Sequence, residues 1–204
     1  MAYVNEQRDY SSSNQIVQLF VKHGADVNAQ NDNYSTPLHL AASSESARIM
    51  KLLLEHGADV NAMDRTQTTP LHLTSSSSSR GLECVWLLIK HGAYINAQDH
   101  RNWTSLYLAS LYGNTGTMQT LIAHGADVNA QTWDQKTPLH IASYSPTGVE
   151  VARLLIEHGA NVNSQDMDHK TPLHLASSIG RKEIVKLLIE QGADINAHVE
   201  GCST

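Results

Sequence analysis

The stretch TPLHLASSIGRKEIVKLLIEQGADINA, Thr171 to Ala197, decides the fold because most of the chain consists of copies of it. Its closing motif, His-Gly-Ala-Asp-Val-Asn-Ala or a close variant, begins at His23, His56, His91, His124, His158 and Gln191. Successive copies are 33, 35, 33, 34 and 33 residues apart. Its opening motif, Thr-Pro-Leu-His, keeps the same register at Thr36, Thr69, Thr137 and Thr171, with the variant Thr104-Ser105-Leu106-Tyr107 between them. The sequence is therefore a repeat array.

The two motifs mark the ends of two helices in each unit. Thr171 before Pro172 is typical of a helix start, because the Thr hydroxyl can cap a free N–H and Pro suits the first helical position. An amphipathic stripe between Ile184 and Leu188 predicts a second helix, and Gly192 can take the left-handed conformation that ends it. The polar stretch after each Gly-Ala pair is rich in Asn and Asp, which favour turns. Each unit is predicted to be helix, short turn, helix and projecting loop.

These motifs and their period resemble the ankyrin repeat family, and the resemblance covers residues 14–198. It implies an all-α solenoid, a stack of antiparallel helix pairs with hairpin loops at roughly right angles to them. It also implies a curvature that places the loops and first helices on a concave face. The expected class of function is a non-catalytic scaffold that binds a protein partner.

The register divides the chain into five full repeats after an N-terminal half repeat or cap at residues 1–30. The full repeats are residues 31–63, 64–98, 99–131, 132–165 and 166–198, and residues 199–204 read as the start of a truncated further repeat. Solenoid ends need a polar outer face, which the last helix stripe does not supply. We therefore expect a fragment of a longer array or of a protein with a further domain. A monomer is predicted, with end-to-end association through the last repeat as an option.

One position departs from the family pattern in every repeat. Two residues before each capping Thr, the family usually has Gly, which tolerates a positive φ. This chain instead has Tyr34, Gln67, Asn102, Gln135 and His169. Asn102 tolerates that conformation best, and the other four hairpin tips are predicted to be strained or to use a different turn.

Composition excludes several classes of function. The net charge is −6, and the 14 Lys and Arg residues are scattered, so no basic stripe predicts nucleic-acid binding. No apolar run approaches the roughly 20 residues that cross a membrane, and residues 1–10 are too polar for a signal peptide. An intracellular, cytoplasmic protein is expected. Cys84 occupies a core position of a second helix and is interpreted as buried and reduced.

Nine of the twelve histidines belong to the two motifs, so we assign them to the scaffold. The resemblance implies that the Thr-Pro-Leu-His group bonds backbone between neighbouring loops, and the His-Gly group suits the last helical turn. The remaining His100, His169 and His198 have no metal-ligand spacing. No phosphate loop or set of catalytic residues stands apart from the repeats. The sequence predicts no enzyme activity, no cofactor and no metal site.

Positions that vary while the scaffold repeats carry the remaining signal. In the family, residues just before the capping Thr and just after the first helix face the concave side. Repeats 1 and 2 have small polar residues there, whereas repeats 3 to 5 have large ones, which suggests a binding surface. The predicted partner-binding residues are His100, Arg101, Trp103, Leu111, Tyr112, Trp133, Asp134, Lys136, Tyr144, Met167, Lys170 and Ile179.

Other interpretations remain open. The aromatic residues could pack on their own neighbouring loops, and Trp86, on the outward side of a second helix, is interpreted as folding against the Ser-rich turn at 75–79. The whole array could instead be a structural spacer within a longer array. It could also be the regulatory region of a larger enzyme or channel.

Overall fold

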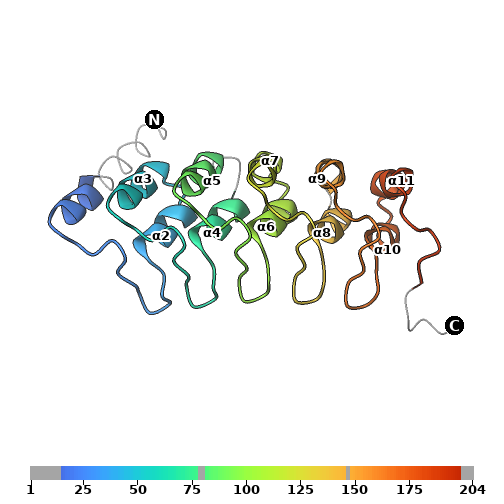
Figure 1. Cartoon of the computed structure of the whole chain (residues 1–204), viewed down its shortest axis with the longest axis horizontal. Coiled ribbons are helices and arrows are strands. Elements are labelled where there is room, and N and C mark those ends of the chain that lie inside the picture. The colour runs from blue at the N-terminus through green and yellow to red at the C-terminus, as the bar shows by residue number, and fades with distance from the viewer. Residues whose placement is uncertain (1–14, 78–80, 146–147, 199–204) are drawn as a thin grey trace, which may run out of the picture.

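The computed structural model describes residues 15–77, 81–145 and 148–198, and in these ranges the chain is helical with no strand. A helix over residues 15–22 comes first. Five helix pairs follow, and Figure 1 shows them as two rows with the hairpins projecting from the side of the first helices. The pairs are α2 (Pro37–Ser43) with α3 (Ala47–Glu55), α4 (Pro70–Ser76) with α5 (Gly81–Lys90), α6 (Ser105–Tyr112) with α7 (Thr115–Ala123), α8 (Pro138–Tyr144) with α9 (Gly148–Glu157), and α10 (Pro172–Ser178) with α11 (Lys182–Glu190). The predicted all-α solenoid of helix pairs with projecting hairpins is confirmed.

Each helix contacts its own partner and its equivalent in the next repeat. First helices contact first helices from α2 to α10, and second helices contact second helices from α3 to α11. The Leu of the opening motif is fully buried at Leu38, Leu71, Leu106 and Leu139. The core is therefore a continuous row of nearest-neighbour interfaces, as expected of a solenoid.

The helix starts follow the predicted chemistry with one addition. Four first helices begin with Thr as N-cap and Pro in the first turn, and in each the His three residues later completes a capping box. In the variant repeat, the Thr104 hydroxyl accepts a hydrogen bond from the Tyr107 N–H at 3.2 Å. The helix start is thus preserved where Pro and His are both missing.

The core cysteine is as predicted. Cys84 is fully buried in α5 and forms no disulfide. Desolvation, with smaller contributions from Glu83 and Glu45, raises the pKa of its thiol to about 11. The thiol therefore stays protonated and packs as a small apolar side chain.

The hairpin tips adopt the strained alternative. Tyr34, Gln67, Asn102, Gln135 and His169 all have φ between 57° and 59°, in the left-handed region. The hairpin thus keeps the geometry that Gly would favour although Gly is absent. These five side chains must accept a backbone conformation that costs about 1–2 kcal/mol for most L-residues.

Candidate functional site

A side chain five residues before each capping Thr closes the hairpin. In repeat 3, Asp99 Oδ1 accepts hydrogen bonds from the N–H groups of Arg101 and Trp103, both at 2.8 Å. Asn31, Asp64 and Asp166 do the same in their repeats. In repeat 4 the hydroxyl of Thr132 accepts from the Lys136 N–H at 3.0 Å. Sequence reasoning missed this role, although the regular Asn or Asp was its signal.

Neighbouring hairpins are joined into one row by backbone hydrogen bonds. The residue four places before a capping Thr donates its N–H to a carbonyl of the preceding hairpin. Trp133 donates to Arg101 at 3.1 Å, and Met167 donates to Asp134 at 3.0 Å. His100 donates to Thr66 at 3.0 Å. The order of the hairpin side chains along the face is therefore fixed by the backbone.

The opening-motif histidines add a second link between hairpins. The Thr137 N–H donates to His140 Nδ1 at 3.1 Å, so that nitrogen is unprotonated, and Nε2 lies 3.0 Å from the Lys170 carbonyl, to which it donates. His39, His72 and His174 bridge in the same way. Desolvation lowers the pKa of His72 and His140, although the carbonyl hydrogen bond opposes the shift. The motif histidines are therefore structural and bond to backbone, as the resemblance implied.

The Asn of the closing motif makes a third link. Asn129 Nδ2 donates to the Gly159 carbonyl at 3.1 Å, and its Oδ1 accepts from the Asn161 N–H at 2.8 Å. The equivalent Asn28, Asn61, Asn96 and Asn163 bridge to the next repeat in the same two ways. The Asn and His side chains of the repeated motifs therefore use their hydrogen-bonding groups within the solenoid. No cluster of potential metal ligands occurs among the described residues.

We define the inner face as the surface formed by the hairpins and the first helices. The hairpin residues of the predicted site are exposed to different degrees. Trp133 is 63 % exposed and Met167 is also exposed, as are His100 and Arg101. Trp103 is half-buried, with its ring centroid 5.2 Å from that of Tyr107 and 5.3 Å from the Arg101 guanidinium carbon. Trp133 is therefore open to a partner, whereas Trp103 is partly an internal packing residue.

Both lysines of the predicted site pair with an aspartate of their own hairpin. Lys136 Nζ lies 2.7 Å from Asp134 Oδ2, and Lys170 Nζ lies 3.2 Å from Asp168 Oδ2. Burial raises the pKa of Asp134, but the hydrogen bonds from Lys136 and Thr132 outweigh it and hold this pKa below its usual value. The hydrogen bond to Asp134 likewise raises the pKa of Lys136. These hairpins thus present nearly neutral pairs rather than free cations.

The helix residues of the predicted site gather around one hollow. Leu111, Tyr144 and Ile179 line a cavity of about 330 Å³ together with Ile141, Ser145 and Arg181. The lining comes from three successive repeats, and it is mainly apolar. Tyr112 is 58 % exposed beside Leu111 but does not line the hollow. Sequence reasoning missed Ile141, which lies inside the motif, and Arg181, which follows the turn.

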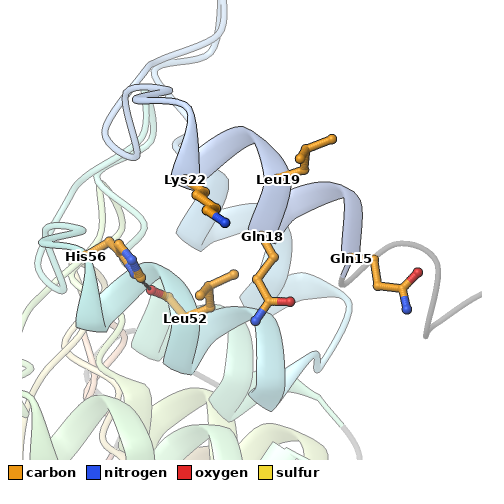
Figure 2. Close-up of a pocket in the computed structure, with 6 residues that line it drawn as sticks. All are labelled: Gln15, Gln18, Leu19, Lys22, Leu52 and His56. Carbon is orange, nitrogen blue, oxygen red and sulfur yellow. Dashed lines mark hydrogen bonds between the residues drawn. The ribbon is translucent and has the colours of Figure 1, made fainter.

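Two other hollows lie between second helices, on the opposite, outer face. Figure 2 shows the first, which is lined by Gln15, Gln18, Leu19 and Lys22 of the N-terminal helix, by Leu52 of α3 and by His56 at the end of α3. Four of its six lining residues have polar side chains. Trp86 of α5 lines the second with Arg48 and Lys51 of α3, and Lys90 lies over its ring at 5.2 Å. Trp86 is 52 % exposed, so it packs on charged stems at the surface rather than being enclosed.

The comparisons with known proteins bear on the repeats rather than on one site. The sequence model of the family described as ankyrin repeats (3 copies) matches residues 9–99, 81–166 and 106–199. A comparison with curated proteins gave no significant match. None of the described helices is long and apolar enough to cross a membrane. Ankyrin repeats are generally modules of protein–protein interaction. The matches run through nearly the whole chain in the register of its helix pairs, so the chain belongs to the ankyrin repeat family.

Proposed function

We propose that the chain is a non-catalytic scaffold that binds a protein partner through the inner face of repeats 3 to 5. The observation that carries the proposal is the apolar hollow lined by Leu111, Tyr144 and Ile179, together with the exposed ring of Trp133 on the hairpin that precedes α8. Exposed aromatic side chains beside a concave apolar site are the anchors that dominate binding energies. Repeats 1 and 2 offer Ser43, Ser44 and other small polar residues at the matching positions.

The difference between repeats 1 and 2 and repeats 3 to 5 argues against the alternative function, a structural spacer. A spacer requires only that each repeat stack on the next, so its solvent-facing residues need not change character along the array. Here the buried motif is repeated, while the positions at the ends of the first helices change from Ser43, Ser44, Ser76 and Ser77 to a set that includes Leu111, Tyr112, Tyr144 and Ile179. The contrast is confined to these positions, because Tyr34 and Leu40 of repeat 1 are exposed as well. Large exposed apolar residues favour aggregation unless a partner covers them, so their convergence on the hollow from three repeats supports binding.

Two exposed tryptophans on opposite faces allow a matched experiment. The full chain would be used to capture proteins from extracts of the cells in which it is naturally expressed, followed by mass spectrometry. Trp133→Ala should lose the partner that the unchanged chain captures, because truncating an anchor ring typically costs about 2 kcal/mol or more. Trp86→Ala, with a similarly exposed ring, should retain it.

Thermal unfolding of both variants separates binding from folding. Each exposed ring should contribute less than about 0.5 kcal/mol to stability, so both variants should melt close to the unchanged chain. Loss of the partner with Trp86→Ala and retention with Trp133→Ala would move the binding site to the outer face.

A further inference from the structure

The inner hollow contains a cation that the rest of the described chain leaves unpaired. Arg181 is the N-cap residue of α11, and its side chain lines the hollow beside Tyr144 and Ile179. Its Nε has no exposed surface and no hydrogen-bond acceptor. No ion pair involves Arg181 in the described ranges. Because Nε is closed to solvent, a bound anion would meet the terminal nitrogens of this guanidinium, which have no hydrogen-bond or ion-pair partner in the described ranges.

The other cations of the predicted inner-face site are already neutralised or stacked. Lys136 and Lys170 pair with Asp134 and Asp168, as described above. Arg101 stacks on Trp103 and donates to His100 at 3.3 Å. A partner that brings a negative charge to this face therefore finds its free positive counterpart at Arg181. A planar guanidinium is well matched to a carboxylate, which can accept two parallel hydrogen bonds from it.

The apolar walls of the hollow determine which kind of side chain can bind next to the carboxylate. Leu111 ends the inner side of α6, Ile141 and Tyr144 belong to α8, and Ile179 follows α10, so the apolar surface crosses three repeats. Arg181 lies at the C-terminal end of this row. A chain segment that crosses the row therefore passes from apolar walls to the cation.

We propose that this hollow binds an extended segment of a protein partner in which an Asp or Glu lies one to three residues from a large apolar residue. The apolar side chain enters the hollow and the carboxylate pairs with Arg181. An extended segment advances about 3.3 Å per residue, and packed helices are about 8–10 Å apart, so this spacing spans one helix row. The proposal rests on the inner face being the binding face and adds the chemistry that it selects.

The first test uses the full chain as bait for a displayed library of random 12-residue peptides held by linkers at both ends. Enriched peptides should carry an acidic residue within three positions of Leu, Ile, Met, Phe or Trp. Arg181→Gln should weaken their binding about tenfold or more. Lys182→Gln removes the neighbouring exposed cation and should leave affinity unchanged. A library that yields no enriched peptide counts against the proposal.

A charge exchange excludes a merely structural role for Arg181. Arg181→Glu should lose the acidic peptide and bind, about tenfold or more better than the unchanged chain does, the same peptide with its acid replaced by Lys. The melting temperatures of both Arg181 variants report whether the fold is kept. A failure of this exchange in a folded variant overturns the proposal.

The outcomes separate this inference from the proposed function. Peptides that depend on Tyr144 but carry no acid and ignore Arg181→Gln would overturn the inference and leave the inner face as the binding site. Peptides that ignore Tyr144→Ala and Trp133→Ala but depend on Trp86 would overturn both.

Discussion

Repeats 3 and 4, residues 99–131 and 132–165, build the same helix pair with different residues at the helix ends. Repeat 4 begins α8 with Thr137 and Pro138, and His140 bridges to the Lys170 carbonyl at 3.0 Å. Repeat 3 begins α6 with Thr104 and Ser105. Its Tyr107, in the place of the histidine, packs its ring against Trp103.

The difference teaches that the links between repeats are partly redundant. Repeat 3 lacks the histidine bridge to the next hairpin, yet two other links to repeat 4 remain. The Trp133 N–H donates to the Arg101 carbonyl at 3.1 Å, and the Asn129 amide donates to the Gly159 carbonyl at 3.1 Å. The alignment of neighbouring repeats is therefore kept by the backbone hydrogen bonds and by the Asn of the closing motif. The opening motif mainly contributes to the free energy of unfolding.

The largest expected effect concerns the turns between the two helices. A Cβ on Gly148 would lie 1.7 Å from the Ala142 carbonyl oxygen, so Gly148→Ala forces the backbone to move. We expect a loss of about 3 kcal/mol in the free energy of unfolding. Gly113 ends α6 with φ 73°, and Gly113→Ala should cost about 1–2 kcal/mol through that conformation. Urea unfolding would contradict the packing argument if the two losses were equal.

The histidine bridge comes next. His140→Ala leaves the Thr137 N–H without its acceptor and the Lys170 carbonyl with only the Asp166 N–H as donor, and it opens space in a fully buried site. The expected loss is about 2–3 kcal/mol by urea unfolding. Tyr107→Phe in repeat 3 removes only a hydroxyl for which no hydrogen bond occurs in the described chain, and should cost less than about 0.5 kcal/mol. A large loss in Tyr107→Phe would show a polar bridge in repeat 3 as well.

The same histidine predicts a pH dependence that repeat 3 cannot share. Burial lowers the pKa of His140 below its usual 6.5, so the unfolded chain binds more protons than the folded chain in acid. Its contribution is complete above about pH 6.5 and declines as pH falls toward the folded pKa. Burial raises the pKa of Tyr107 to about 12, so it does not titrate in this range.

The measurement compares urea midpoints at pH 7.5 and pH 5 for the unchanged chain and for His140→Ala. The unchanged chain should lose more stability between these two values, because the variant no longer has this titrating ring. An equal loss in both proteins would mean that His140 is not held neutral by the fold.

The sequence predicted what is local and repeated, and missed what depends on neighbours in space. Helix starts, Gly ends and the strained hairpin position follow from single residues in register, and all appear in the structure. Arg181 was missed because all of its neighbours in the hollow except Ile179 come from repeats 3 and 4, which lie tens of residues earlier in the chain. Trp103 and Trp133 looked equivalent in type, but only the fold places Tyr107 against one of them. Whether the predicted inner-face residues bind a partner stays a prediction.

A smaller, stabilising effect is expected from making repeat 3 more like repeat 4. Ser105 is buried, and its hydroxyl has no hydrogen-bond partner. Thr104 is extended, with ψ 165°, which suits a residue before Pro. Ser105→Pro should therefore raise the free energy of unfolding by about 1 kcal/mol, through lost unfolded-state entropy and removal of the unsatisfied hydroxyl. Ser105→Ala isolates the second contribution, and a lower stability for both variants would contradict the argument.

The smallest expected effect is at the hairpin tip, where repeat 3 has the residue that tolerates a positive φ better than the residue in repeat 4. Asn102 and Gln135 have φ 57° and 59°, and Asn tolerates this left-handed conformation better than Gln because its short polar side chain can bond locally. Gln135→Gly removes a conformational cost of about 1–2 kcal/mol but adds about 0.4–1 kcal/mol of unfolded-state entropy, so a net gain of roughly 0.5 kcal/mol is expected. Asn102→Gly relieves less strain for the same entropy, so the change in the free energy of unfolding should be near zero or slightly negative.

Both substitutions keep the tip hydrogen bonds, from the residue 135 N–H to Thr132 at 2.8 Å and from the residue 102 N–H to Asp99 at 2.9 Å. Chemical unfolding of the two variants side by side decides the matter. A gain for Asn102→Gly equal to that for Gln135→Gly would show that side-chain identity does not set the strain at the hairpin tip.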